Sequence, residues 1–227
     1  MQKKWVISLG GSRIVPDEVD SKFLEEFKEL IFSHPSHKFV VVTGGGTTAR
    51  RYMSALKKLG KSNKVQSKEG IAITRFHASY MSHLFGKKAN EKIPKSMKKV
   101  KSMLSKNQIV FCGGLIYKDK NTSDATAAKL AAYLDCPFIN LTNVKGLYTS
   151  NPAKNKKAKF IPKITWKKFD GIAKKIKFKA GQHFVLDQSA AKIIMKTKTP
   201  TYIVGSLASI DKILKGKKVF GGTLIEG

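Results

Sequence analysis

The stretch from Lys38 to Tyr52 constrains the fold more than any other part of the sequence. Phe39–Val42 is an uninterrupted apolar run rich in β-branched residues, a pattern that is typical of a strand buried on both faces. Three consecutive glycines, Gly44 to Gly46, follow almost at once, and Thr47 or Thr48 is expected to cap a helix behind them. The sequence therefore predicts a strand, a glycine turn and a helix start in immediate succession.

Such a turn has the physical properties of a phosphate site. Glycine has no Cβ, so its backbone can approach an anion closely, and the free N–H groups of the following first helical turn attract negative charge. Arg50 and Arg51 add forked donors that fit phosphate oxygens. The alternative is a tight turn without a ligand, but three glycines exceed what a turn needs. The Walker and dinucleotide-binding glycine patterns are both absent from this turn.

The length and composition indicate a globular intracellular protein. The 227 residues, 41% of them hydrophobic, suffice for one α/β domain or two closely packed lobes. We see no signal peptide and no apolar run of the roughly 20 residues that a membrane helix needs. Cys112 and Cys136 both lie in strand-like contexts, which favours two buried thiols in a reducing, cytoplasmic compartment over a disulfide.

The net charge of the chain is strongly positive. Lys and Arg number 44 against 15 Asp and Glu, which gives +29. Such a field attracts ATP, other nucleotides and nucleic acid without choosing among them. The excess is mostly Lys and is spread along the chain, and the very basic stretch Lys87–Lys106 is interpreted as a solvated face in preference to a nucleic-acid patch.

Further apolar runs predict five more strands, with helices between them. Alternating strands and helices predict an α/β fold, a three-layer αβα sandwich around a mostly parallel central sheet. The expected strands, besides the one at Phe39–Val42, are Lys4–Leu9, Gln108–Cys112, Phe138–Leu141, Thr201–Val204 and Thr223–Ile225.

The predicted helices rest on apolar periodicity and on capping residues. Asp20 or Ser21 is expected to cap the first helix, while Gly60–Lys68 is expected to be a loop. Asp124 is expected to cap the helix Ala125–Leu134, and Asp187 to open the helix Gln188–Lys196. The other predicted helices are Phe23–Ile31, Glu69–Phe85, Ser96–Leu104 and Ala208–Leu214.

Four glycine or polar turns follow predicted strands, after Leu9, Thr43, Cys112 and Leu141. In an open parallel sheet, ligands bind outside the carboxyl ends of the strands. Several anion-ready turns at one edge suggest two phosphorylated ligands side by side, which is the arrangement needed for phosphoryl transfer.

These turns, taken in order, resemble those of the amino acid kinase family, and most closely its archaeal uridylate kinase branch. The similarity extends over essentially the whole chain and rests on six motifs. They are Ser8–Ser12 with Val15-Pro16, Thr43–Tyr52, Gly70–Arg75, Thr122–Ala125, Thr142–Pro152, and Asp187 with Ala190–Ile194.

The resemblance implies a role for each motif, with ATP and UMP as the two ligands and Mg²⁺ carried on ATP. The acids Asp124 and Asp187, together with Arg50, would act at the reacting centre. UMP would be held by Gly45, Ser67, Thr122 and Ser123. ATP would be held by Ser8, Leu9, Gly10, Gly11, Ser12, Gly46, Arg50, Thr142, Tyr148 and Asn151. The resemblance implies no metal ligand set belonging to the protein itself.

The chain also departs from the pattern of the branch. Ser67 stands where the branch has an Asp that contacts the UMP ribose, and the loop Leu115–Asn121 is about two residues longer than its counterpart. Asn151 and Lys145 each replace an Asp, and Ser8 stands where other branches have a catalytic Lys. The ATP half of the site is therefore closer to the pattern than the acceptor half.

The resemblance implies a single domain over residues 1–227, with an acceptor lobe at roughly 1–135 and an ATP lobe at roughly 136–227. The expected activity is transfer of the ATP γ-phosphoryl group to UMP by a homo-oligomer, a hexamer built as a trimer of dimers. One alternative is a sister kinase with another phosphate or carboxylate acceptor, motivated by Ser67 and the altered loop. A second is a catalytically weak nucleotide- or RNA-binding regulator, motivated by the charge of +29 and by the lost acidic residues.

Overall fold

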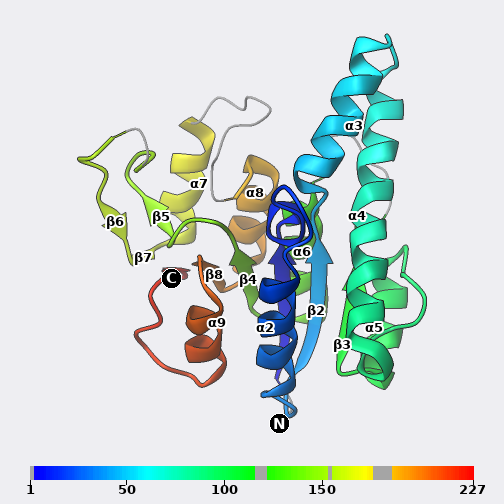
Figure 1. Cartoon of the computed structure of the whole chain (residues 1–227). Helices are drawn as coiled ribbons and strands as arrows, with labels where there is room; N and C mark the ends of the chain where they lie inside the picture. Colours follow the sequence, from blue (N-terminus) through cyan, green and yellow to red (C-terminus); the bar gives the residue numbers. More distant parts are fainter. Residues whose placement is uncertain (1–2, 116–121, 153–154, 176–185) are drawn as a thin grey trace.

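The computed structural model describes residues 3–115, 122–152, 155–175 and 186–227. A seven-stranded sheet forms its centre, in the order β3-β2-β1-β4-β8-β9-β7, and helices cover both faces (Figure 1). All strand pairs in this sheet are parallel except β8 with β9. The predicted fold class, a three-layer αβα sandwich with a mostly parallel sheet, is confirmed.

The strands of the main sheet are short and deeply buried. They are β1 (Lys4–Leu9), β2 (Lys38–Thr43), β3 (Ile109–Cys112), β4 (Phe138–Leu141), β7 (Lys163–Ile164), β8 (Thr201–Val204) and β9 (Thr223–Ile225). A separate antiparallel pair joins β5 (Leu147–Tyr148) to β6 (Phe160–Ile161). The predicted strand positions agree to within a residue at each end, while the two-residue strands β5, β6 and β7 were not predicted.

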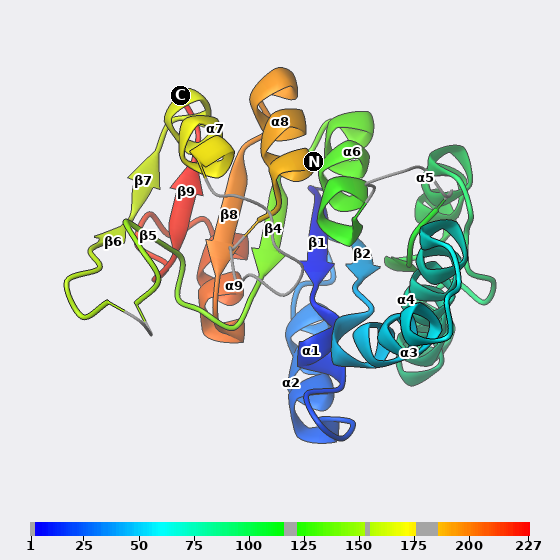
Figure 2. The ribbon, with the colours of Figure 1, turned by 90° about the horizontal axis from the view of Figure 1, so that it is seen from above.

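Successive residues of a strand point to opposite faces of the sheet, so β1, β2 and β3 supply both apolar cores. Val6, Val40 and Val110 pack under α5 (Met97–Lys106), α6 (Ser123–Leu134), α7 (Trp166–Lys175) and α8 (Gln188–Thr197). Ile7, Val41 and Phe111 pack on the other face, under α2 (Ser21–Phe32), α4 (Asn63–Phe85) and α9 (Leu207–Leu214). Seen from above, α6, α7 and α8 lie on one side of the sheet and α2 and α9 on the other (Figure 2).

The remaining helices are α1 (Gly11–Ile14), α3 (Gly46–Lys58) and the 3₁₀ turn η1 (Gly86–Lys88). Helices α3 and α4 form a hairpin that extends beyond the sheet (Figure 1). The loop predicted at Gly60–Lys68 is confirmed only as far as Ser62, which caps α4, and is wrong beyond it because the helix begins at Asn63. Residues 63–68 can be polar because this end of α4 is largely exposed. They are helical because they continue a helix that packs against α3.

The predicted caps of two helices also need correction. Helix α3 begins at Gly46, with Gly45 as its N-cap and no side-chain cap, so neither Thr47 nor Thr48 caps it. Helix α6 is capped by Thr122, whose hydroxyl accepts from the Ala125 N–H at 3.0 Å, and Asp124 lies in its first turn. Asp20 and Asp187 do cap α2 and α8 as predicted.

Candidate functional site

The carboxyl ends of β1, β2, β3 and β4 lie at one edge of the sheet. Leu9 is in register with both Thr43 and Leu141, and Val42 is in register with Cys112. The four turns that follow these strands therefore meet at the same edge, as the sequence predicts. Any ligand bound outside that edge would contact residues from both halves of the chain.

Two of these turns touch backbone to backbone. The Gly44 N–H donates to the Leu9 carbonyl at 2.9 Å. A Cβ placed on Gly11 would lie 2.4 Å from the Gly46 nitrogen, and one on Gly46 would lie 2.4 Å from the Gly11 carbonyl carbon. Gly46 also has a positive φ of 58°, a conformation that glycine adopts without strain. Glycine is thus required on both sides of this contact.

The first turn of α3 has no capping side chain, so its leading N–H groups stay available to an anion. The Arg50 guanidinium donates to the Thr47 hydroxyl at 2.9 Å, which keeps a positive charge over this turn. The glycine turn and uncapped helix start expected from the triple glycine are therefore present, and phosphate binding there stays a prediction.

Two acidic side chains lie at neighbouring helix starts. The Ser8 hydroxyl donates to the Asp124 carboxylate at 2.7 Å, and the Thr122 hydroxyl donates to the Asp187 carboxylate. The other oxygen of Asp187 accepts from the N–H groups of Ser189 and Ala190, at 2.7 and 2.9 Å. These bonds fix the starts of α6 and α8 relative to each other.

Asp124 is the more perturbed of the two acids. The pKa of its carboxyl is raised to about 6, first by desolvation and then by the negative charge of Asp187, while the hydrogen bond from Ser8 opposes the rise. A carboxyl with a raised pKa beside a second acid is characteristic of a functional site. A nearby cation would favour the charged form of Asp124.

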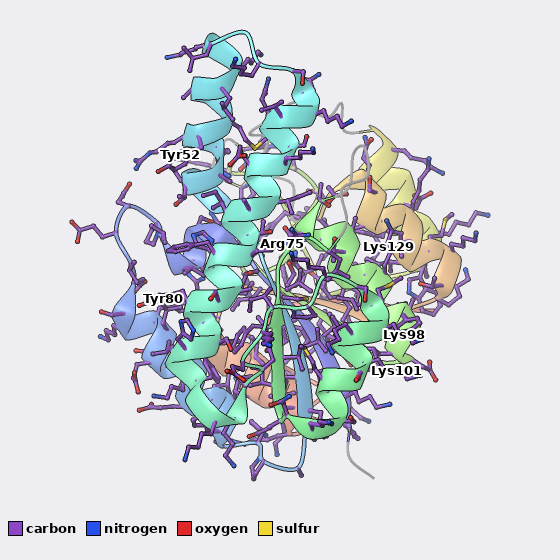
Figure 3. All side chains as sticks on the ribbon, turned by 90° about the vertical axis from the view of Figure 1, so that its right-hand side faces the viewer. Tyr52, Arg75, Tyr80, Lys98, Lys101 and Lys129 are labelled. Carbon is purple, nitrogen blue, oxygen red and sulfur yellow. The ribbon has the colours of Figure 1, made fainter. Side chains whose placement is uncertain are left out.

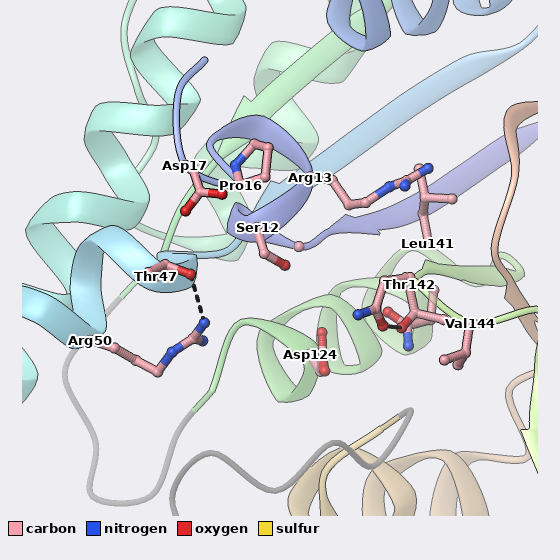
Figure 4. Close-up of a pocket in the computed structure, with 13 residues that line it drawn as sticks. Ser12, Arg13, Pro16, Asp17, Thr47, Arg50, Asp124, Leu141, Thr142 and Val144 are labelled. Carbon is pink, nitrogen blue, oxygen red and sulfur yellow. Dashed lines mark hydrogen bonds between the residues drawn. The ribbon is translucent and has the colours of Figure 1, made fainter. Parts of the chain in front are cut away.

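A cavity of about 620 Å³ opens at this edge of the sheet. Figure 4 shows Arg50 toward one end of its lining, Arg13 toward the other and Asp124 between them. The volume lies within the range of small-molecule sites. The lining residues are Gly10, Ser12, Arg13, Pro16, Asp17, Thr47, Arg50, Asp124, Asn140, Leu141, Thr142, Asn143 and Val144.

Five of the residues singled out in the sequence line this cavity directly, namely Gly10, Ser12, Arg50, Asp124 and Thr142. Others do not line it and belong to the adjoining turns, strand ends and helix caps. They are Ser8, Leu9, Gly11, Gly45, Gly46, Thr122, Ser123 and Asp187.

Three predicted site residues lie away from the lining. Ser67 lies near the start of α4, one helical turn before Gly70, whose carbonyl would be 3.6 Å from a Cβ on Gly45. Tyr148 packs its ring edge-on against Phe160, with the ring centroids 5.5 Å apart. Asn151 is exposed. Most of the altered acceptor loop, residues 116–121, lies outside the described residues.

The sequence interpretation missed Arg13, Asn140 and Asn143 in the lining. A signal was present for Arg13, since it directly follows the first glycine turn. Asn140 is the one polar residue of the buried strand β4. A polar amide near the end of an apolar run was a signal that this side chain lies at the ligand edge of the sheet.

The family model described as "Amino acid kinase family" matches residues 3–205 of this chain. The chain belongs to the amino acid kinase family. Its relatives include the uridylate kinase of Thermococcus onnurineus, 36% identical over 97% of this chain and 98% of the relative. The uridylate kinase of Methanocaldococcus jannaschii is 32% identical over 98% and 99% of the two chains.

Solved structures of the family support the same fold. The crystal structure of uridylate kinase from Archaeoglobus fulgidus superposes with a TM-score of 0.86 at 33% identity, covering 98% of this chain and 99% of that one. The UMP kinase of Bacillus anthracis, at 20% identity and a TM-score of 0.81, supports the fold alone. The expected resemblance to the archaeal uridylate kinase branch of the amino acid kinase family is therefore confirmed.

Proposed function

We propose that this protein is an ATP-dependent UMP kinase that transfers the γ-phosphoryl group of ATP to UMP, giving ADP and UDP. The observation that carries the proposal is the cavity at the carboxyl edge of the sheet, where two contacting glycine turns, two arginines and Asp124 meet. The near full-length similarity to proteins named uridylate kinase supports UMP as the acceptor.

In this reaction an oxygen of the UMP phosphate forms a bond to the γ-phosphorus, and the bond from that phosphorus to the ADP oxygen breaks. Because a phosphate monoester loses its second proton with a pKa near 6, the attacking oxygen is already largely deprotonated at neutral pH. The protein then contributes chiefly position and positive charge rather than a proton acceptor.

The ATP half of the site fits this task. The contacting turns at Gly11 and Gly46 bring two stretches of backbone together beside the cavity, and the uncapped start of α3 supplies N–H donors for phosphate oxygens. Arg50 would stabilise the charge that spreads over the transferred group. Asp124 is a hard oxygen donor of the kind that suits Mg²⁺, and the ion would neutralise phosphate charge when it is bound with ATP.

The proposed members of the acceptor half are Gly45, Ser67, Thr122 and Ser123. Ser67 supplies a hydroxyl where the branch has a carboxylate, so it can make one hydrogen bond to a ribose but adds no charge. A sister kinase for another small phosphate or carboxylate remains the competing function because of this residue and the loop Leu115–Asn121.

An acceptor panel distinguishes these functions. Purified protein with Mg²⁺ and ATP is offered UMP, CMP, AMP, an alkyl monophosphate and a small carboxylate, and ADP release is followed. We expect the highest kcat/KM with UMP. A preference for an acceptor that is not a nucleotide would reject the proposal in favour of the sister kinase.

We further propose that the protein assembles into a homo-oligomer, with a hexamer as the expected form. Several large apolar side chains on the α3–α4 hairpin are exposed, namely Tyr52, Leu59, Phe76 and Tyr80; Tyr52 and Tyr80 are labelled in Figure 3. An apolar surface of this kind supports association. Light scattering on the purified protein measures the mass, and a monomer at micromolar concentration would contradict the proposal.

Two additional expectations belong to the same proposal. Cys112 and Cys136 are free and buried, which supports action in the reducing cytoplasm, and no helix within the described residues is long and apolar enough to span a membrane. The division into an acceptor lobe at 1–135 and an ATP lobe at 136–227 is supported by the sheet order, since β1, β2 and β3 lie on one side of β4 and β8, β9 and β7 on the other.

A further inference from the structure

Arg13 is a second arginine of the cavity and lies at the opposite end from Arg50 (Figure 4). It comes from α1, directly after the first glycine turn, and its side chain is half-buried. Arg50 is exposed. Because a charge interacts more strongly when water is partly excluded, Arg13 is the better placed of the two to bind an anion tightly.

The guanidinium of Arg13 is held in place from two sides. It lies over the ring of Phe23, 4.5 Å from the centroid, and one terminal nitrogen donates to the Gly205 carbonyl at 3.4 Å. A stacked guanidinium keeps its in-plane donors free for bidentate contacts. The contact to Gly205 is long, so it leaves most of the hydrogen-bonding capacity of the group unused.

One of its donors is buried without a partner. The Arg13 Nε atom is shielded from solvent and makes no hydrogen bond to any described residue. An unsatisfied buried donor on a charged group is costly and uncommon in folded proteins. Its presence beside a cavity indicates that a bound group completes the site.

We infer that Arg13 binds the polyphosphate of the donor nucleotide and thereby sets the position of ATP in the cavity. The inference rests on the proposed function for the identity of the donor. The neighbours of Arg13 in the lining are Leu141, Thr142 and Val144 (Figure 4), which belong to the part of the chain assigned to ATP. The side chain of Arg13 points away from Arg50 at the start of α3 and toward Leu141 (Figure 4), which argues against a contact with UMP.

The test compares Arg13→Met with Arg13→Lys. The first keeps an apolar stem over Phe23 and removes the charge, and the second keeps the charge and removes the planar fork. Lys22→Met, an exposed position on α2, is the matched control for the loss of one positive charge. Binding of ATP, inorganic tripolyphosphate and UMP to the full chain is measured by calorimetry at fixed ionic strength, with thermal unfolding alongside.

We expect Arg13→Met to weaken ATP and tripolyphosphate about 10- to 100-fold, the range for losing a hydrogen bond between charged groups, with UMP changed by less than about 2-fold. Arg13→Lys should fall between, and Lys22→Met should match the parent protein. Equal losses for ATP and UMP, or a lowered Tm with unchanged ATP affinity, would show that Arg13 only joins α2 to the end of β8 and would overturn the inference. A loss for ATP without one for tripolyphosphate would overturn the phosphate assignment.

The result is independent of the acceptor. If the parent protein fails to phosphorylate UMP yet binds ATP and tripolyphosphate in an Arg13-dependent manner, the proposed acceptor is wrong and the role of Arg13 stands. If the parent turns over UMP and the Arg13 variants bind all three ligands like the parent, the inference on Arg13 fails and the proposed function stands.

Discussion

The hydroxyl of Thr122 donates a hydrogen bond to the carboxylate of Asp187, although the two residues are 65 positions apart in the chain. Thr122 caps α6 and Asp187 caps α8, so this bond joins two helix starts at the ligand edge of the sheet. This one hydrogen bond therefore holds the starts of α6 and α8 next to each other, and with them the side chains of Asp124 and Asp187.

Asp187→Asn tests whether Asp187 does more than cap a helix. Asparagine caps about as well as aspartate, so we expect Tm to stay within a few degrees of the parent while kcat falls by roughly 100-fold or more, the range for removing a positioned charge at a reacting centre. Steady-state kinetics and calorimetric unfolding measure the two effects.

The matched control is Asp20→Asn, the same substitution at the cap of α2, where Asp20 accepts from the Phe23 N–H at 3.0 Å. Its turnover should equal that of the parent. Unchanged kcat in Asp187→Asn would remove Asp187 from the site and leave it a cap alone.

Gly46→Ala tests the contact between the two glycine turns. The new Cβ would lie 2.4 Å from the Gly11 carbonyl carbon and 2.5 Å from the Ser12 nitrogen, both backbone atoms that cannot move independently. We expect a loss in the free energy of unfolding of roughly 3 kcal/mol or more, from strain at positive φ together with overpacking, and a loss of ATP binding.

Gly60→Ala separates these two contributions. Gly60 also has a positive φ, at 70°, but nothing lies within 4 Å of a Cβ placed there. The expected cost is about 1 to 2 kcal/mol, with ATP affinity retained. Equal costs for the two substitutions, measured by urea unfolding, would mean that the turn contact adds nothing.

The strands and their shared edge could be predicted from the sequence because long apolar runs and glycine turns are local signals. The two-residue strands β5, β6 and β7 carry too few residues for any periodicity, and they form through partners elsewhere in the chain. The sequence analysis assigned the cap of α6 to Asp124 instead of Thr122. Both residue types cap helices well, so the sequence alone does not show at which of the two the helix begins.

The site was predictable where glycine and acidic residues mark turns and helix starts, as at Gly10 and Asp124. At Arg13 the sequence offers only its position after the first glycine turn, because the contacts that hold its side chain come from Phe23 and Gly205 on other elements. Nor can the sequence show that Ser8 donates to Asp124, because a strand residue and a helix residue 116 positions apart meet only in the folded sheet.

The high positive charge leads to a prediction about nucleic acid. Lys98 and Lys101 on α5 and Lys129 on α6 lie on one side of the molecule (Figure 3), and one aromatic contact accompanies them, with Lys101 Nζ 5.6 Å from the Tyr133 ring centroid. We expect weak RNA binding with a Kd of about 10⁻⁴ to 10⁻⁶ M at physiological salt, falling steeply as salt rises. Filter binding across a salt series measures it.

A paired substitution tests whether α5 is a defined site. Lys98→Glu with Lys101→Glu should weaken RNA binding no more than Lys217→Glu with Lys218→Glu, an exposed pair beyond α9, because diffuse charge attracts a polyanion from any side. Kinase turnover should be unchanged in both. Loss of binding in the α5 pair alone, together with nanomolar affinity in the parent, would favour the RNA-binding regulator.

The raised pKa of Asp124 makes stability depend on pH. The pKa is about 6 in the folded protein against 3.8 ordinarily, so the folded state holds more protons between these values. The stabilising contribution of Asp124 to the free energy of unfolding is therefore fully present below about pH 4 and is lost as pH rises through about 6. Asp124→Asn removes this dependence, so relative to the parent it should gain roughly 1 to 3 kcal/mol between pH 4 and pH 7.

Urea unfolding of both proteins at several pH values yields the difference, in which the other carboxyl groups cancel. Asp211→Asn is the control of opposite sign, because the hydrogen bond from Lys215, with help from His34, lowers the pKa of Asp211. The contribution of Asp211 is lost as pH falls below the ordinary range for Asp, so its difference from the parent should change below about pH 4, where the difference for Asp124→Asn is already constant. A constant difference for Asp124→Asn between pH 4 and pH 7 would mean that Asp124 is charged throughout this range, and that a cation at the site offsets the desolvation and the repulsion by Asp187.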